Sequence, residues 1–145
     1  MTVRRIMQGK EGQAVIAVKP DDEVSSAAAT LAKHRIGAVI VTVDGASVDG
    51  ILSERDIVRA LGTSGVDCMT RKVRDLMTAS VVGCQMDDTA NSVMERMSDG
   101  RFRHMPVLED GRLTGVISIG DVVNARIKEI QNENAALTGM ISNNW

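Results

Sequence analysis

Two short stretches of the chain place a hydroxyl and a carboxylate at the same spacing. Ser53 and Asp56 form the first pair, and Ser118 and Asp121 form the second. An ionised Asp side chain is only an acceptor, so it can take hydrogen bonds from two hydroxyl groups of a bound molecule. At a helix start it would also lie near backbone N–H groups that favour phosphate. The same spacing is typical of helix capping, and the two roles can coexist because the carboxylate has two oxygens.

Basic side chains that could hold an anion lie close to these pairs. Arg55 lies inside the first motif, whereas the equivalent position of the second motif is Gly120. Arg101, Arg103 and His104 cluster in the second half of the chain. Arg guanidinium groups match phosphate oxygens in a bidentate manner, and the alternative interpretation is a solvated basic turn. In either case the two candidate sites are expected to be unequal.

An internal repeat relates the two pairs. Residues 15–45, shifted by 66 positions, fall on residues 81–111, and after one extra residue in the first copy the shift becomes 65. The segments ahead of the copies, 3–7 and 73–77, also resemble each other. Each copy alone is too small to bury much surface. We therefore expect the two copies to pack face to face about a pseudo-two-fold axis.

Each copy has the same order of expected strands and helices. A short strand comes first, and a helix follows it. Two further strands come next, connected by an Asp-Gly pair, and a second helix starts at the Ser of each motif. The expected strands are 15–18, 38–43 and 50–53, and 81–84, 105–108 and 115–118. The first helices are expected at 24–34 and 90–99, ending near Gly37 and Gly100. The predicted fold class is α+β, with two β-α-β-β-α repeats.

Composition and motifs exclude several classes of function. The chain has 145 residues, 43% of them hydrophobic, and a formal net charge of −2. Nucleic-acid binding is not expected, because it usually requires a basic excess or aromatic platforms, and Phe102 and Trp145 are the only aromatic residues. The chain has no catalytic motif, so we expect that it is not an enzyme.

The two cysteines and the apolar segments bear on the cellular compartment. Cys68 and Cys84 fit neither a disulfide framework nor metal-ligand spacing, so small buried side chains are expected, with a redox switch as the alternative. We read no signal peptide at the start of the chain and no apolar run of membrane-spanning length. A cytoplasmic protein without a membrane partner is therefore expected.

The tandem unit resembles a cystathionine-β-synthase (CBS) domain pair, or Bateman module, and in particular small bacterial stand-alone CBS-domain proteins. Residues 50–56 and 115–121 both fit the family pattern of Gly, hydrophobic, any residue, Ser or Thr, two residues and Asp. Residues 104–107 resemble the loop that enters the family's second strand. Ile40 stands where the second copy has Pro106, so the first copy lacks that proline loop. The resemblance covers residues 3–127.

The resemblance implies that adenosine-containing ligands bind in clefts between the repeats, with AMP favoured and NAD(H), ADP, ATP or S-adenosylmethionine as alternatives. The implied ribose contacts are Ser53, Asp56, Ser118 and Asp121. The implied borders of the adenine pocket are Val18, Lys19, Gly37, Ala38, Val39, Cys84, Gln85, His104, Met105 and Pro106. Phosphate contacts are expected from Arg55, Arg101, Arg103 and His104. No catalytic cofactor and no metal are expected.

The remaining residues suggest a helical tail that could pair with another chain. We divide the chain into repeat 1 with its lead-in (1–66), repeat 2 with its linker (67–127) and a tail (128–145). Apolar residues with one Asn recur at heptad spacing, at Val123, Ile127, Ile130, Asn134, Leu137 and Ile141. This pattern indicates either a homodimer seam or a helix that packs on its own body.

Two functions of different classes fit the sequence. The first is a regulatory sensor of adenine nucleotides, whose state an unidentified effector protein reads. The second is a structural dimerisation or interaction module with degenerate ligand sites.

Overall fold

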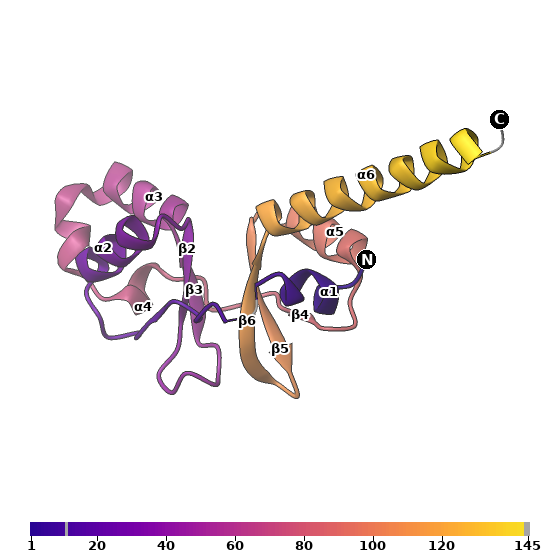
Figure 1. Cartoon of the computed structure of the whole chain (residues 1–145). Coiled ribbons are helices and arrows are strands. Elements are labelled where there is room, and N and C mark those ends of the chain that lie inside the picture. Colours follow the sequence, from indigo (N-terminus) through magenta and orange to yellow (C-terminus); the bar gives the residue numbers. More distant parts are fainter. Residues whose placement is uncertain (11, 144–145) are drawn as a thin grey trace.

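The computed structural model describes residues 1–10 and 12–143, and in it the chain forms two three-stranded sheets with helices packed on them (Figure 1). In each sheet the first strand pairs in parallel with the second, which pairs antiparallel with the third. The first half contains β1 (Ala17–Val18), α2 (Val24–His34), β2 (Ala38–Val41), β3 (Gly50–Ser53), α3 (Glu54–Ser64) and the 3-10 helix η1 (Gly65–Thr70). The second half contains β4 (Cys84–Gln85), α5 (Ala90–Gly100), β5 (His104–Glu109), β6 (Arg112–Ser118) and α6 (Ile119–Asn143). This confirms the expected α+β fold of two β-α-β-β-α repeats.

The two lead-in segments form short helices, α1 (Val3–Gln8) and α4 (Val73–Leu76), and each packs on the repeat that it does not directly precede. Val3 lies in the core of the second repeat, and Val73 lies in the core of the first. The backbone N–H of Val3 donates to the carbonyl of Asp88, as that of Val73 donates to Asp22, each at 2.8 Å. Figure 1 shows α1 against the second sheet and α4 against the first. The chain therefore crosses between the repeats twice.

The first helix of each repeat ends in the region of the glycine that the sequence indicated, and a left-handed arginine caps it. Arg35 follows α2 with a φ of 53°, and Arg101 follows α5 with a φ of 56°. Gly100, the last residue of α5, leaves room for the Phe102 ring, with which a Cβ atom at this position would clash. The left-handed conformation is mildly unfavourable for a residue other than glycine. A basic side chain at a helix C-terminus offsets part of this cost through the helix dipole.

Only the second Asp-Gly pair forms a two-residue hairpin turn. Asp110 and Gly111 have φ values of 51° and 77°, as the tight turn requires. In the first repeat, β2 ends at Val41, two residues earlier than expected, and β3 resumes at Gly50. The Asp44 carboxylate accepts hydrogen bonds from the backbone N–H groups of Ser47 and Ala46, which lower its pKa to about 2. This local capping stabilises a wider loop.

Each motif lies where a strand passes directly into a helix. Ser53 ends β3 and caps α3, and Ser118 ends β6 immediately before α6. The first N–H of α3, on Glu54, donates to the carbonyl of Gly37 at 2.9 Å, and that of α6, on Ile119, donates to Arg103 at 2.8 Å. These bonds hold each helix start against the segment that enters the middle strand of the same sheet.

Helix α6 continues well beyond the body of the second repeat, as Figure 1 shows. The apolar side chains of the expected seam are solvent-exposed, with exposed fractions of 39% for Val123, 48% for Ile127, 47% for Ile130 and 57% for Leu137. Asn134 is exposed as well, and the side chain of Ile141 lies outside the described residues. Along its described length the seam therefore does not pack on the chain's own body. No helix among the described residues is long and apolar enough to cross a membrane.

Candidate functional site

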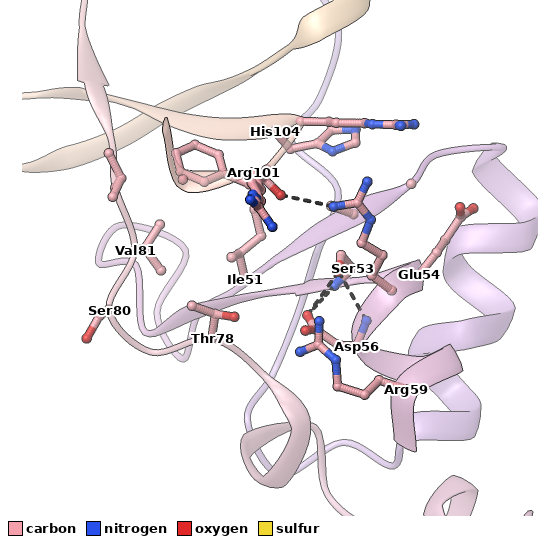
Figure 2. A pocket seen from close by; sticks show the side chains of 17 residues that line it. Ile51, Ser53, Glu54, Asp56, Arg59, Thr78, Ser80, Val81, Arg101 and His104 are labelled. Atoms are coloured by element: carbon pink, nitrogen blue, oxygen red, sulfur yellow. Dashed lines mark hydrogen bonds between the residues drawn. The ribbon is translucent and has the colours of Figure 1, made fainter. Parts of the chain in front are cut away.

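The first candidate site is a cavity of about 340 Å³ that both repeats line. The first repeat contributes the end of β3 and the first turns of α3, and the second contributes residues 100–104. Residues 78–82, which connect α4 to β4, also reach the cavity (Figure 2). Strand β3 ends here because Ser53 caps the helix that follows, so the motif itself places its side chains in the cavity.

Asp56 uses one of its two carboxylate oxygens for hydrogen bonds within the motif. Its Oδ2 atom accepts hydrogen bonds from the backbone N–H of Ser53 at 2.9 Å and from the Ser53 hydroxyl at 3.0 Å. The backbone N–H of Asp56 donates to Ser53 Oγ at 3.3 Å, which completes a capping box. Within the described part of the chain, Oδ1 has no hydrogen-bond partner. Capping and ligand binding can therefore coexist at this carboxylate.

Four arginines give the first cavity a basic wall. Arg55 and Arg59 come from α3, and Arg101 and Arg103 come from the segment after α5. Arg55 reaches across the cleft, and its Nη1 donates to the backbone carbonyl of Arg101 at 3.0 Å (Figure 2). This bond uses one of five guanidinium donors, so the remainder can face an anion. A carboxylate acceptor next to several guanidinium groups suits a molecule that carries both hydroxyl groups and phosphate.

The second candidate site is a larger cavity of about 720 Å³ near the second motif. Asp121 Oδ2 accepts the backbone N–H of Ser118 at 2.9 Å, as Asp56 does in the first motif. It also accepts a hydrogen bond from the ammonium group of Lys10 at 2.9 Å. Partial burial raises the pKa of Asp121, but the hydrogen bonds from Lys10 and the backbone N–H of Ser118 outweigh burial and hold this pKa below its usual value.

The two cavities share a wall formed by Gly37, Ala38 and His104. A Cβ atom on Gly37 would lie 3.1 Å from His104 Cε1, so the imidazole packs closely on the backbone of the first repeat. Burial lowers the pKa of His104; nearby Asp121 and Glu54 oppose this shift. A change of charge on His104 would therefore change the electrostatic potential in both cavities.

The lowered pKa of His104 predicts that acid destabilises the fold. The unfolded chain binds the His104 proton more readily than the folded chain, so the free energy of unfolding falls as pH drops below about 6.5 toward the lowered pKa. We expect the melting temperature to fall between pH 7.5 and 5.5, and His104→Gln to weaken this dependence. The exposed His34, changed to Gln, is the matched control. An equal pH dependence in the His104 variant and the unaltered chain would contradict the prediction.

The structure brings together many, but not all, of the residues indicated by the sequence. The first cavity is lined by Gly37, Ala38, Ser53, Arg55, Asp56, Arg101, Arg103 and His104, and the second by Gly37, Ala38, His104, Ser118 and Asp121. The following residues line neither cavity: Val18, Lys19, Val39, Cys84, Gln85, Met105 and Pro106. Four of these, Val18, Val39, Cys84 and Met105, belong to the hydrophobic cores.

Sequence reasoning missed several lining residues that lie outside the motifs. Lys10 follows the first lead-in helix, and Thr78 and Ser80 follow the second. Arg59 lies one helical turn after Asp56. The similarity of the two lead-in segments was the available signal, since equivalent segments of a duplicated unit are expected to reach equivalent clefts.

Both cysteines are free and buried. Burial raises the pKa of the Cys84 thiol to about 11, with Asp88 acting in the same direction and Arg96 opposing it. A thiol with a raised pKa is a poor nucleophile at neutral pH, because the thiolate is the reactive form. Cys84 therefore fits a packing role better than a redox switch.

Comparisons with known proteins identify the family to which this fold and these sites belong. The sequence model of the CBS domain matches residues 3–63 and 73–128. A CBS-domain-containing protein from Agrobacterium tumefaciens has a similar crystal structure, with 47% sequence identity and a TM-score of 0.83, over 87% of this chain and 99% of that one. A CBS domain protein from Pyrobaculum aerophilum, complexed with AMP, has 22% identity and a TM-score of 0.73 over 83% of this chain and 89% of that one, a similarity of fold alone.

The chain is also similar to the mitochondrial CBS domain-containing protein CBSX3 of Arabidopsis thaliana. The two are 34% identical over 127 residues, which is 82% of this chain and 62% of that protein. The chain thus spans less than two thirds of that relative's length. The family model covers both repeats and the fold agrees with that of the Agrobacterium protein, so the chain belongs to the CBS-domain family as a tandem pair of repeats.

Proposed function

We propose that the chain is a regulatory module that binds an adenine nucleotide, with AMP favoured, in the clefts between its CBS repeats. The observation that carries this proposal is Asp56, whose Oδ1 is unpaired within the described part of the chain and lines a cavity with four arginines. The ribose hydroxyls donate to this carboxylate, and the guanidinium groups hold the phosphate. The AMP complex of the Pyrobaculum protein, which has the same fold, supports an adenosine-containing ligand.

The size of the first cavity favours a mononucleotide. A volume of about 340 Å³ is at the small end of the range for ligand sites. A dinucleotide such as NAD(H) would extend out of the cavity, as would the longer phosphate chain of ATP. In this proposal the nucleotide acts as a signal and not as a catalytic cofactor, and it shifts the packing of the repeats by its differential affinity for two arrangements.

A thermal-shift screen tests the proposal. AMP, ADP, ATP, NAD(H) and S-adenosylmethionine are compared, with GMP as the control for the base. A ligand present at about 100 times its Kd stabilises the fold by about 2.7 kcal/mol, which raises the Tm by roughly 10 °C in a chain of this size. We expect AMP to give such a rise and GMP to give little. The proposal fails if none of the adenosine ligands raises the Tm.

We further propose that the module is a homodimer, joined by parallel pairing of α6. The seam residues Ile127, Ile130 and Leu137 are about half exposed in the single chain, which is costly unless another surface covers them. With Ile127 at the first apolar position of the heptad, Asn134 falls at the same position one heptad later. In a parallel pair, Asn134 meets its own copy and can form a hydrogen bond, whereas an antiparallel pair would bury it against an apolar residue.

Changing Asn134 to Leu tests this pairing. A single polar residue on an apolar seam specifies the number of strands and their register, so its loss is expected to yield a mixture that includes species larger than a dimer. Light scattering measures the mass of each species. Asn132→Leu, the same change outside the seam, should leave the dimer unaltered. An unchanged mass for the Asn134 variant would count against the seam.

In this proposal the output passes to an effector protein, and the module works in the cytoplasm. The chemistry of the cysteines supports that compartment. Both cysteines are free of disulfides and buried, which fits a reducing compartment.

A further inference from the structure

Lys10 gives the second cleft a cation that is paired with the motif carboxylate, whereas among the described residues no cation is paired with Asp56 in the first cleft. Its ammonium group donates to Asp121 Oδ2 at 2.9 Å and to the backbone carbonyl of Val116 at 2.8 Å. The ion pair is about three-quarters buried, with exposed fractions of 26% for the Lys10 side chain and 25% for the Asp121 side chain. At this depth a charge-assisted hydrogen bond is stronger than at the surface.

The pseudo-two-fold relation identifies the residue that is equivalent to Lys10. Positions in the first lead-in segment correspond to those 70 residues later. Met7 would meet a Cβ atom on Gly115 at 2.5 Å, and Met77 would meet one on Gly50 at 2.6 Å, so the two methionines occupy matching places. The same shift takes Lys10 to Ser80, which lines the first cavity.

The backbone contacts near these two residues show the same relation. The carbonyl of Ile51, in β3, accepts the backbone N–H of Thr78 at 2.9 Å. Its equivalent in β6, the carbonyl of Val116, accepts the Lys10 ammonium instead. In the first cleft, the segment after α4 therefore binds strand β3 through its backbone and makes no bond to Asp56. In the second cleft, the Lys10 ammonium group binds both strand β6 and the motif carboxylate, Asp121.

We propose that Lys10 is an intramolecular stand-in for the ligand, which makes the second cleft the weaker nucleotide site and the first cleft the preferred one. The inference rests on the proposed nucleotide binding. The ammonium group neutralises Asp121 and occupies the space next to its carboxylate, so ribose hydroxyls that enter the second cleft must displace it. In the first cleft they meet a carboxylate that pairs with no cation in the described part of the chain. Oδ1 of both aspartates lacks a hydrogen-bond partner there, so the Lys10 charge on Asp121 Oδ2 is what distinguishes the two clefts.

The consequence is an ordered response to nucleotide concentration. The first cleft fills first, and the second fills only at a concentration high enough to displace Lys10 from Asp121. The loss of one charge-assisted hydrogen bond corresponds to a difference in affinity of roughly tenfold or more. Lys10 follows α1, which packs on the core of the second repeat. Release of Lys10 from Asp121 would therefore also change the contact between the first lead-in segment and that repeat.

Isothermal titration with AMP tests the proposal, with each cleft isolated by a substitution in the other. Asp56→Ala leaves the second cleft, and the pair Asp56→Ala with Lys10→Ser should bind AMP roughly tenfold tighter than Asp56→Ala alone. Lys10→Gln, which keeps a donor for the Val116 carbonyl without the charge, should also bind more tightly. The reciprocal variant, Asp121→Ala with Ser80→Lys, should bind roughly tenfold more weakly than Asp121→Ala alone.

The outcomes separate this inference from the function on which it rests. Melting curves establish that each variant is folded. If the unaltered chain binds AMP but Lys10→Ser and Lys10→Gln leave the affinity of the second cleft unchanged, or weaken it, the inference alone is overturned, and a weakening would make Lys10 a phosphate contact. If neither the unaltered chain nor any variant binds AMP, the proposed function fails and the inference fails with it.

Discussion

Replacing both Asp56 and Asp121 with alanine is expected to weaken AMP binding at both clefts strongly while the chain stays folded. Each change removes an acceptor from the mouth of one cleft, and a hydrogen bond to a charged group contributes about 1.5–3 kcal/mol. The loss per cleft is therefore about tenfold to a hundredfold in affinity. Isothermal titration measures the binding, and circular dichroism establishes that the helices are retained.

The control for this prediction must lose a helix cap without touching either cleft. Thr89 caps α5, since its hydroxyl oxygen accepts the backbone N–H of Ser92 at 3.1 Å, and it lines neither cavity. Thr89→Ala should cost about 1 kcal/mol of stability, as loss of a cap does, and should leave AMP binding intact. If the double aspartate variant binds AMP as tightly as the unaltered chain does, both motifs act only as helix caps and the prediction is wrong.

The second large effect concerns the exchange of the lead-in helices. Val3 is fully buried in the core of the second repeat, and Val73 is fully buried in the core of the first. Each valine-to-alanine change removes two buried methyl groups and leaves a cavity, which costs about 2 kcal/mol. We expect Val3→Ala to destabilise the second repeat and Val73→Ala to destabilise the first. In each case the destabilised repeat is not the one that directly follows the substituted residue in the sequence.

The two buried cysteines report on the two halves separately. Cys84 lies in the same core as Val3, and Cys68 lies in η1 of the first repeat. A thiol reagent reacts only when its half opens, so Val3→Ala should raise the rate at Cys84 by roughly thirtyfold and change Cys68 much less. Val73→Ala should do the reverse. Faster reaction of Cys68 in the Val3 variant, with Cys84 unchanged, would mean that the lead-ins do not exchange.

The repeat and most of its elements could be predicted because duplication leaves the same pattern twice. Helix α2 begins at Val24 and ends at His34 as expected, since its apolar residues recur at helical spacing and face one core. Strand β3 also has its expected bounds, because Gly50 opens it against Met77 and Ser53 ends it by capping α3. The bounds of both elements therefore depend on residues within or next to them, which the sequence displays.

The parts that sequence reasoning missed depend on contacts between distant segments. A lysine in a linker carries no sign of its partner, so the bond from Lys10 to Asp121, 111 positions away, could not be read from spacing. The helices α2 and α5 end where the sequence indicated, but the left-handed caps are Arg35 and Arg101, which residue type does not indicate. In the first hairpin, Asp44 binds two backbone N–H groups of its own loop, which outweighs the preference for a tight turn.

A titration that compares AMP with 2′-deoxy-AMP tests the central claim most directly. The two nucleotides have the same base and the same phosphate, and they differ by one of the hydroxyl groups that we assign to Asp56. We predict that removal of this hydroxyl weakens binding to the unaltered chain by about tenfold or more, because a charge-assisted hydrogen bond is lost. Equal affinity for the two nucleotides would contradict the assignment of the motif aspartates to the ribose.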